Sequence, residues 1–336
     1  MARRALAAAV IWGCALALAS VALAGNGGFA PPDSVTDSGS AINRIYWFLF
    51  GICAVIFLIV EGALVWFIFR FRRRRAVEYG RDAPQIHGNT RLEVVWTAIP
   101  VAIVVVIAAV AFATVPTVNA NPSDASDALP IRVDAHQFYW QYTYPNGAIS
   151  LDTLRIPVGR TITLELHSDD VAHSWWVNEI TGKRDAIPGR TNYLSFEARR
   201  TGTFRGQCAE LCGLLHAVMY TEVQIVPADE YESWVARTAA AQSGVGGTSD
   251  LGKEEFQQVC AKCHGLSGQG DIGPGIVGKI TSRASLERLL ENGQNTANLP
   301  SYMPPVGRGW TERQVNALYE YMTTTPALRG GGESGG

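Results

Sequence analysis

The sequence predicts a membrane-anchored protein of several domains: a two-helix transmembrane hairpin, a β-sandwich or barrel, and a small all-α domain. Three observations predict this order. Two long apolar runs lie in the first third of the 336 residues. Short strand patterns fill the middle, and helical patterns follow a glycine-rich linker. The net charge of −2 gives no reason to expect nucleic acid as a partner.

Residues 1–24 have the pattern of a secretory signal peptide. Arg3 and Arg4 precede an apolar stretch, and Ala22-Leu23-Ala24 forms a small-x-small cleavage site. An uncleaved membrane helix is the alternative interpretation. Residues 25–43 are rich in Gly, Pro, Ser and Asp, which predicts an exposed N-terminal segment.

Residues 44–70 and 94–115 are expected to be transmembrane helices, because each apolar run can cross a hydrocarbon core of about 30 Å. The loop between them, residues 71–93, carries a dense arginine cluster that begins in the RFRRRR stretch at the end of the first run. The positive-inside rule places this loop in the cytoplasm. We therefore expect a multi-pass protein of the bacterial inner membrane, with the chain from residue 116 on the periplasmic side. Glu61 lies inside the first run, where a carboxylate is either functional or faces a partner helix.

Residues 116–228 are predicted to form a periplasmic β-domain. Ile131 to Tyr144 is rich in aromatic and β-branched residues, and TITLEL at 161–166 alternates strictly. Further short strands are expected at 193–198, 203–206 and 219–226. Several short strands at this spacing favour a sandwich or barrel.

The sequence CAELCGLLHAVM, residues 208–219, concentrates soft ligands between the last two expected strands. Cys208, Cys212, His216 and Met219 supply thiolate, imidazole and thioether groups, which favour copper over magnesium or calcium. A second thiolate would let two copper ions share both sulfurs, and His173 in DVAHSWW is the candidate for a second imidazole. A disulfide or a zinc pair is the alternative for the two cysteines.

The C-terminal third is divided into a helix and flexible linker at 229–249, a helical domain at 250–325, and a disordered tail at 326–336. CAKCH, residues 260–264, matches the C-x-x-C-H signature of a covalent c-type haem. Cys260 and Cys263 would attach the haem, His264 would be the proximal ligand, and Met303 the distal one. A thioredoxin-like dithiol is the alternative, but no βαβ pattern surrounds this motif.

At this point the chain resembles subunit II of a haem–copper cytochrome c oxidase that carries a fused C-terminal cytochrome c domain. The resemblance covers about residues 40–325. It rests on EVVWTAIP, HQFYWQYTYPNG, HSWWV, KRDAIPGRTN and GQCAELCGLLHAVM. It implies a cupredoxin-like fold for the β-domain and a dinuclear copper centre of the CuA type.

The resemblance also implies roles for single residues. Cys208 and Cys212 would bridge two copper ions, and His173 and His216 would each bind one. Met219 and the backbone carbonyl of Glu210 would be weak ligands.

The same resemblance implies roles for two carboxylates. The Glu210 carboxylate would help to hold a Mg²⁺ shared with subunit I, which carries haem a and CuB. Glu93 matches a glutamate near the start of a proton path into that subunit.

The aromatic segment differs from the family pattern. Many members have HQWYW, with the first tryptophan as the electron-input position, whereas this chain has Phe138, followed by Tyr139 and Trp140. A nearby acidic docking residue of the family is replaced by Thr143. Both differences favour a tethered donor over direct docking of a soluble cytochrome c.

The expected function is the electron-input subunit of a proton-pumping terminal oxidase that reduces oxygen to water. Electrons would pass from cytochrome c or a bc-type complex through the covalent haem to copper, and on to subunit I and the other oxidase subunits. One alternative is the corresponding subunit of a CuA-type nitric oxide reductase. Another is a stand-alone membrane-tethered electron carrier or copper protein.

Overall fold

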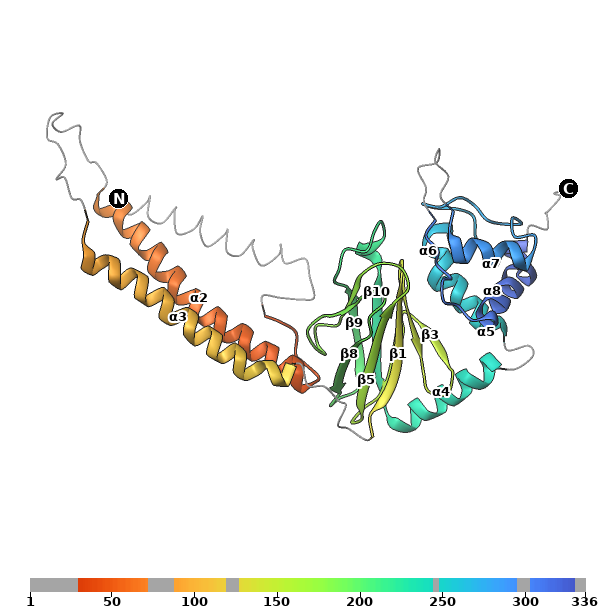
Figure 1. Ribbon diagram of the computed structural model, residues 1–336, viewed down its shortest axis with the longest axis horizontal. Helices are drawn as coiled ribbons and strands as arrows, with labels where there is room; N and C mark the ends of the chain where they lie inside the picture. The colour runs from red at the N-terminus through yellow and green to blue at the C-terminus, as the bar shows by residue number, and fades with distance from the viewer. Residues whose placement is uncertain (1–29, 72–87, 119–126, 244–247, 295–302, 330–336) are drawn as a thin grey trace, which may run out of the picture. The chain divides into compact units, whose positions relative to one another are not determined.

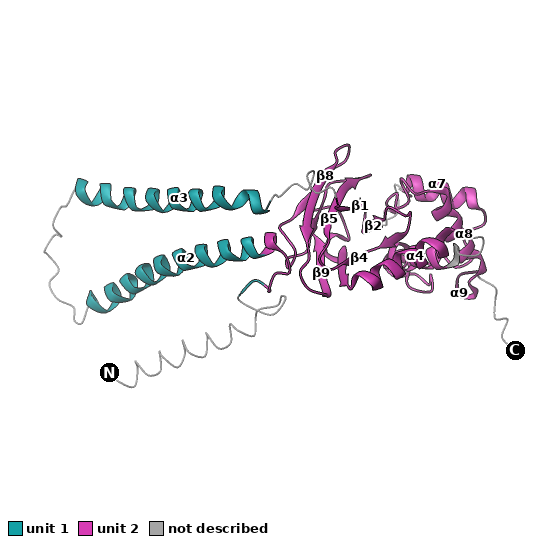
Figure 2. Cartoon of the chain, turned by 90° about the horizontal axis from the view of Figure 1, so that it is seen from below, with its two compact units in different colours: residues 1–31, 40–118 teal, residues 32–39, 119–336 magenta. Residues whose placement is uncertain are grey.

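The computed structural model describes residues 30–71, 88–118, 127–243, 248–294 and 303–329. The expected signal peptide and most of the arginine-rich loop lie outside these residues. The chain divides into two compact units, which Figure 2 colours separately. Residues 1–31 and 40–118 form unit 1, and residues 32–39 and 119–336 form unit 2.

Unit 1 contains two long apolar helices, α2 (Asp37–Arg70) and α3 (Thr90–Val118) (Figure 1). Both are long and apolar enough to cross a membrane. Helix α2 begins several residues before the apolar run that predicted it. Thr36 explains this early start, because its Oγ1 accepts the Gly39 N–H at 3.0 Å and so satisfies a free amide of the first turn.

The β-domain in unit 2 is a sandwich of two five-stranded sheets (Figure 1). The first sheet has the order β3-β2-β1-β5-β8 and the second the order β4-β10-β9-β6-β7. The strands of the first sheet are β1 (Leu129–His136), β2 (Tyr139–Thr143), β3 (Ile149–Leu151), β5 (Thr161–Ser168) and β8 (Asn192–Glu197). Those of the second are β4 (Thr153–Pro157), β6 (His173–Trp176), β7 (Arg184–Ala186), β9 (Gly202–Cys208) and β10 (Tyr220–Val226).

The stretch from Ile131 to Tyr144, which was expected to be β-structure, belongs to two strands. The chain reverses at Gln137-Phe138, and β1 and β2 pair as an antiparallel hairpin with His136 opposite Tyr139. Almost every residue of both strands is buried, since the C-terminal helices described below cover part of this sheet. No alternation of polar and apolar residues therefore shows where β1 ends and β2 begins.

The core of the sandwich is aliphatic and aromatic, and Trp140, Trp175 and Tyr142 are fully buried in it. Their polar atoms are partly paired there, because the Trp175 Nε1–H donates to the Tyr142 hydroxyl at 2.9 Å. The alternating burial of β5 and β9 gives each sheet one inner face. The loops that connect the strands lie at the ends of this rigid sandwich.

A helical domain follows the sandwich in unit 2. Helix α4 (Ala228–Ser243) leads to α5 (Thr248–Glu255), so helix begins inside the segment that was expected to be a flexible linker. The other elements are η3 (Phe256–Cys260), α6 (Ala261–His264), α7 (Arg283–Asn292), α8 (Glu312–Thr324) and α9 (Pro326–Arg329). Thr311 caps α8 in a full capping box with Gln314.

Candidate metal centre

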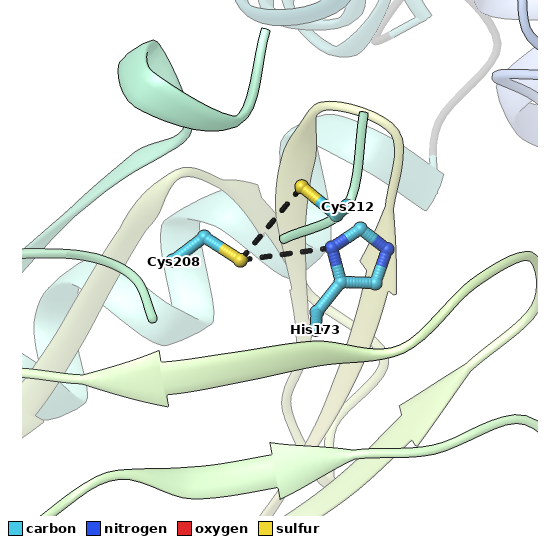
Figure 3. A group of neighbouring side chains, drawn as sticks. All are labelled: His173, Cys208 and Cys212. Atoms are coloured by element: carbon cyan, nitrogen blue, oxygen red, sulfur yellow. Dashed lines mark hydrogen bonds between the residues drawn. The ribbon is translucent and has the colours of Figure 1, made fainter. Parts of the chain in front are cut away.

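Pairing between two strands of the second sheet brings the candidate copper ligands together. His173 is the first residue of β6, and Cys208 is the last residue of β9. These strands are antiparallel neighbours, with Trp175 opposite Cys208. Cys212 lies on the connection that follows β9, and its side chain points back toward Cys208 (Figure 3).

The three side chains in Figure 3 form a compact cluster. The Cys208 Sγ lies 3.9 Å from the Cys212 Sγ and 3.8 Å from the His173 Nδ1. All three ligand atoms lie within 4.8 Å of one another. A sulfur–sulfur bond is about 2.05 Å long, so the two cysteines are free thiols and not a disulfide.

The remaining candidate ligands surround the same two sulfurs. The His216 Nδ1 lies 3.6 Å and the Met219 Sδ 3.8 Å from the Cys212 Sγ. The Glu210 carbonyl oxygen lies 3.3 Å from the Cys208 Sγ. Each sulfur therefore faces one imidazole, and one weaker donor lies beside each. This donor set fits soft or borderline metal ions, copper first among them.

The cluster is largely shielded from water. His173 and Met219 are 0% exposed, and Cys208 and Cys212 are each 3% exposed. The short helix η2 (His216–Val218) places His216 between the buried sulfurs and the surface. Shielding of this kind excludes competing water ligands.

The two thiols are electrostatically coupled. A hydrogen bond from the Cys212 thiol lowers the pKa of Cys208, and His173 lowers it further. The same interaction raises the pKa of Cys212. Binding of a metal ion would require both sulfurs as thiolates.

Asp170 orients His173, and the sequence analysis missed this residue. The Asp170 Oδ1 lies 2.8 Å from the His173 Nε2, so the Nδ1 faces the sulfurs. Burial lowers the pKa of His173, but the hydrogen bonds to Asp170 and Cys208 outweigh it and the net shift is upward. The sequence contained a signal for this role, because Asp170 is a carboxylate three residues before a candidate histidine ligand.

The two carboxylates with expected roles lie away from the sulfur cluster. The Glu210 side chain is exposed and lies 3.5 Å from Lys183 Nζ. Glu93 is in the first turn of α3, in unit 1, where its Oε1 accepts the Asn89 N–H at 3.2 Å.

The aromatic residues expected at the electron-input position are all buried. Phe138 is 8% exposed, whereas Tyr139 and Trp140 are 0% exposed. The Trp140 ring meets the His173 ring edge-on, with centroids 6.1 Å apart. The segment is therefore next to the sulfur cluster, but it is not an open docking surface.

The candidate haem residues lie in the helical domain. Cys260 ends η3, and Cys263 and His264 belong to α6. The His264 Nδ1 lies 2.7 Å from the Pro274 carbonyl, which leaves Nε2 as the ring nitrogen for an iron. Met303 is held by two backbone hydrogen bonds with Gln294, both of 3.0 Å. The residues present fit a covalent haem.

Comparison with known families agrees with this arrangement. Residues 24–114 match the model for the transmembrane domain of cytochrome c oxidase subunit II, and residues 149–226 match its periplasmic domain. Residues 248–322 match the model for subunit III of the cbb3-type cytochrome c oxidase.

Individual proteins are similar to most of the chain or to its β-domain. Cytochrome c oxidase subunit 2 of Alkalihalophilus pseudofirmus is 33% identical, over 79% of this chain and 82% of the relative. The Synechocystis protein of that name is 31% identical, over 64% and 77%. The crystal structure of the periplasmic domain of subunit II (CoxB) of Bradyrhizobium japonicum is 32% identical, with a TM-score of 0.33, over 33% of this chain and 94% of that one.

The matched segments contain both apolar helices, the Cys/His cluster and the C-terminal helical domain. Members of the matched subunit II family are subunits of an oxidoreductase complex, and the family implies CuA copper and, through the C-terminal domain, haem c. The chain belongs to the cytochrome c oxidase subunit 2 family, in a form that carries a cytochrome c domain at its C-terminus.

Proposed function

We propose that this chain carries electrons from a cytochrome c or a bc-type complex, through its own covalent haem and a dinuclear copper centre, to the haem of subunit I, where oxygen is reduced to water. One observation carries the proposal. Two thiols, two imidazoles, a thioether and a backbone carbonyl converge on one buried end of the sandwich. When bound, the copper pair supplies one-electron redox chemistry with little change in geometry.

The protein residues would hold two copper ions in a fixed frame. Cys208 and Cys212 would bridge the ions, and His173 and His216 would each bind one. Met219 and the Glu210 carbonyl would be weak ligands. Asp170 would fix the ring orientation of His173, and the rigid β6–β9 pair would keep the ligands in place during electron transfer.

Residues of the helical domain would hold the haem. Cys260 and Cys263 would form the two thioether links, while His264 and Met303 would be the axial ligands. The Pro274 carbonyl would fix the His264 tautomer. Filling both axial positions with protein ligands favours electron transfer over binding of small molecules.

The membrane part of the proposal places the two helices across a bacterial inner membrane as a multi-pass anchor, with the two redox domains on the periplasmic side. The exposed Leu211 and Leu214, which are 79% and 82% exposed, support a contact of the copper loop with another oxidase subunit. The exposed Glu210 carboxylate would complete a Mg²⁺ site at that contact. Glu93 would lie at the start of a proton path.

Purification of the full chain from its membrane tests this proposal. We expect one covalent haem and two copper ions per chain, together with a co-purifying haem a subunit that consumes oxygen. The chain without such a subunit would instead be a tethered carrier. Fewer than two coppers in a fully folded chain would refute the dinuclear centre.

A further inference from the structure

Lys262 lies between the two haem-attachment cysteines, yet its side chain reaches the β-domain. Its Nζ lies 2.5 Å from the Asp152 Oδ2 and donates to the Phe138 carbonyl at 2.9 Å. The side chains of Lys262 and Asp152 are only 20% and 14% exposed. An ion pair that is shielded this far from water holds its geometry more firmly than a surface pair.

Backbone conformation and hydrogen bonds hold Asp152 in position for its contact with Lys262. The Asp152 φ of 56° lies in the left-handed region, which a residue other than glycine seldom adopts. The other carboxylate oxygen, Oδ1, accepts the Trp140 N–H at 2.9 Å, and the Asp152 N–H donates to the Trp140 carbonyl at 2.8 Å. Asp152 thus joins Lys262 to the tryptophan that meets His173 edge-on.

A second group of contacts comes from the segment that follows Met303. The Tyr139 hydroxyl donates to the Val306 carbonyl at 2.6 Å and accepts the Trp310 Nε1–H at 2.6 Å. The Gln314 Nε2–H donates to the Gln141 Oε1 at 2.7 Å. Both parts of the helical domain that would ligate the haem therefore contact the β2 segment.

The opposite side of this segment contacts the copper loop, residues 208–219. The Gln137 side-chain amide donates to the Cys212 carbonyl. A Cβ on Gly213 would lie only 3.2 Å from the Phe138 ring, so that ring packs directly against the loop. Residues 137–140 thus link the haem motif, residues 260–264, to the copper loop.

The helical domain also covers the free edge of the first sheet. The Leu151 N–H of the edge strand β3 donates to the Glu254 Oε1 at 2.8 Å, and the Ile149 N–H to the Gln242 Oε1 at 2.8 Å. Such capping satisfies amides that an edge strand otherwise leaves unpaired. A buried apolar cluster spans the same contact: Tyr139, Ile149, Leu151, Leu251, Val259 and Ala317.

We propose that Lys262 is a positioning residue that docks the helical domain, which would carry the haem, on the β-domain, which would carry the copper. Electrons would then reach the copper ligands through Phe138, Asp152 and Trp140. This inference rests on the proposed function. The transfer moves one electron, oxidising the iron from ferrous to ferric and reducing the copper pair by one electron, with no bond made or broken. An outside donor then delivers electrons to the cytochrome domain, because that domain covers the aromatic segment.

Hydrogen–deuterium exchange of the full chain tests the docking without relying on catalysis. The Leu151 amide is the probe, because its acceptor belongs to the helical domain. We expect Lys262→Met and Asp152→Asn to raise its exchange rate about tenfold or more, as for the loss of one partner of a shielded ion pair. The matched control Lys279→Met, at an exposed lysine of the same domain, should leave it unchanged.

Flash-induced reduction of the haem in the same variants tests positioning. The haem-to-copper rate should fall about tenfold in Lys262→Met and recover in part in Lys262→Arg, with unchanged optical spectra of both centres. Protection of the Val223 amide in β10 shows that the sandwich is folded. If Lys262→Met does not fold, Asp152→Asn decides the question alone.

The proposal would be overturned if the Leu151 amide exchanged at the wild-type rate in both Lys262→Met and Asp152→Asn. It would also be overturned if this amide exchanged faster while the haem-to-copper electron-transfer rate stayed unchanged. A wild-type chain without covalent haem or copper would refute the proposed function instead. The exchange comparison measures the domain contact and the metal and haem analysis measures the cofactors, so the two failures are distinguishable.

Discussion

The two candidate redox sites of this chain are built in different ways. The copper ligands come from strands β6 and β9 and the loop after β9, and strand pairing brings His173 to Cys208 across 35 residues of sequence. The haem motif needs five consecutive residues, and only Met303 comes from a distant segment. The candidate copper site therefore depends on the folded sandwich, whereas most of the candidate haem site depends on residues that are adjacent in the sequence.

The largest expected effect is on the copper site alone. Cys212→Ser removes one of the two sulfurs between which the other ligands lie, so copper should fall from about two ions per chain to about one or fewer. The haem should stay attached. Metal analysis and the optical spectrum measure both, with Cys53→Ser, an exposed cysteine of α2, as control. Two tightly bound coppers in Cys212→Ser would contradict the bridging role.

The second variant removes the two haem-attachment cysteines and leaves the candidate copper ligands unchanged. In a Cys260→Ser/Cys263→Ser chain, haem should no longer survive denaturing electrophoresis, because both thioether links are gone. The copper content should be unchanged, since all copper ligands belong to the β-domain. Loss of copper in this variant would show that the two sites do not assemble independently.

A smaller effect is expected from the carboxylate that orients His173. Asp170→Asn should weaken copper binding about 10–100-fold, because the ring loses a fixed orientation and a charged partner. Competition with a copper chelator measures this affinity. Asp169→Asn is the matched control, because that neighbouring carboxylate lies near His136 and not His173. Equal losses in both variants would contradict the orienting role.

The smallest effect concerns the pH dependence of the domain contact. Burial raises the pKa of Glu254 to about 7, with the nearby Asp152 adding to the shift. Glu254 therefore holds its proton more tightly when the helical domain is docked on the β-domain than when the two domains are separated. Docking should be strongest below about pH 4.5 and weaken as pH rises to about 7, by about 1 kcal/mol after allowance for solvent screening.

Protection of the Leu151 amide, corrected for the intrinsic exchange rate, measures this dependence. Glu254→Gln should remove the slope between about pH 4.5 and 7, because the amide does not titrate. The surface variant Glu291→Gln should keep it. Protection that rises over this range in the wild-type chain would contradict the assigned proton.

The sequence alone determined the parts of this protein whose physics is local. Apolar runs of bilayer length predicted α2 and α3. The copper loop and the C-x-x-C-H motif identified most of the candidate ligands before any distance was known, and the family resemblance added the Glu210 carbonyl. Chemistry that depends on residue type and short spacing can be predicted in this way.

Only the tertiary structure decided how these parts meet. It divided residues 131–144 into a hairpin, because the residues around the reversal are mostly buried and no alternation of polar and apolar residues separates the two strands. It identified Asp170 as the partner of His173 and revealed the contact of Lys262 with Asp152. These contacts join residues far apart in the chain or set side-chain orientation, and neither periodicity nor composition carries that information.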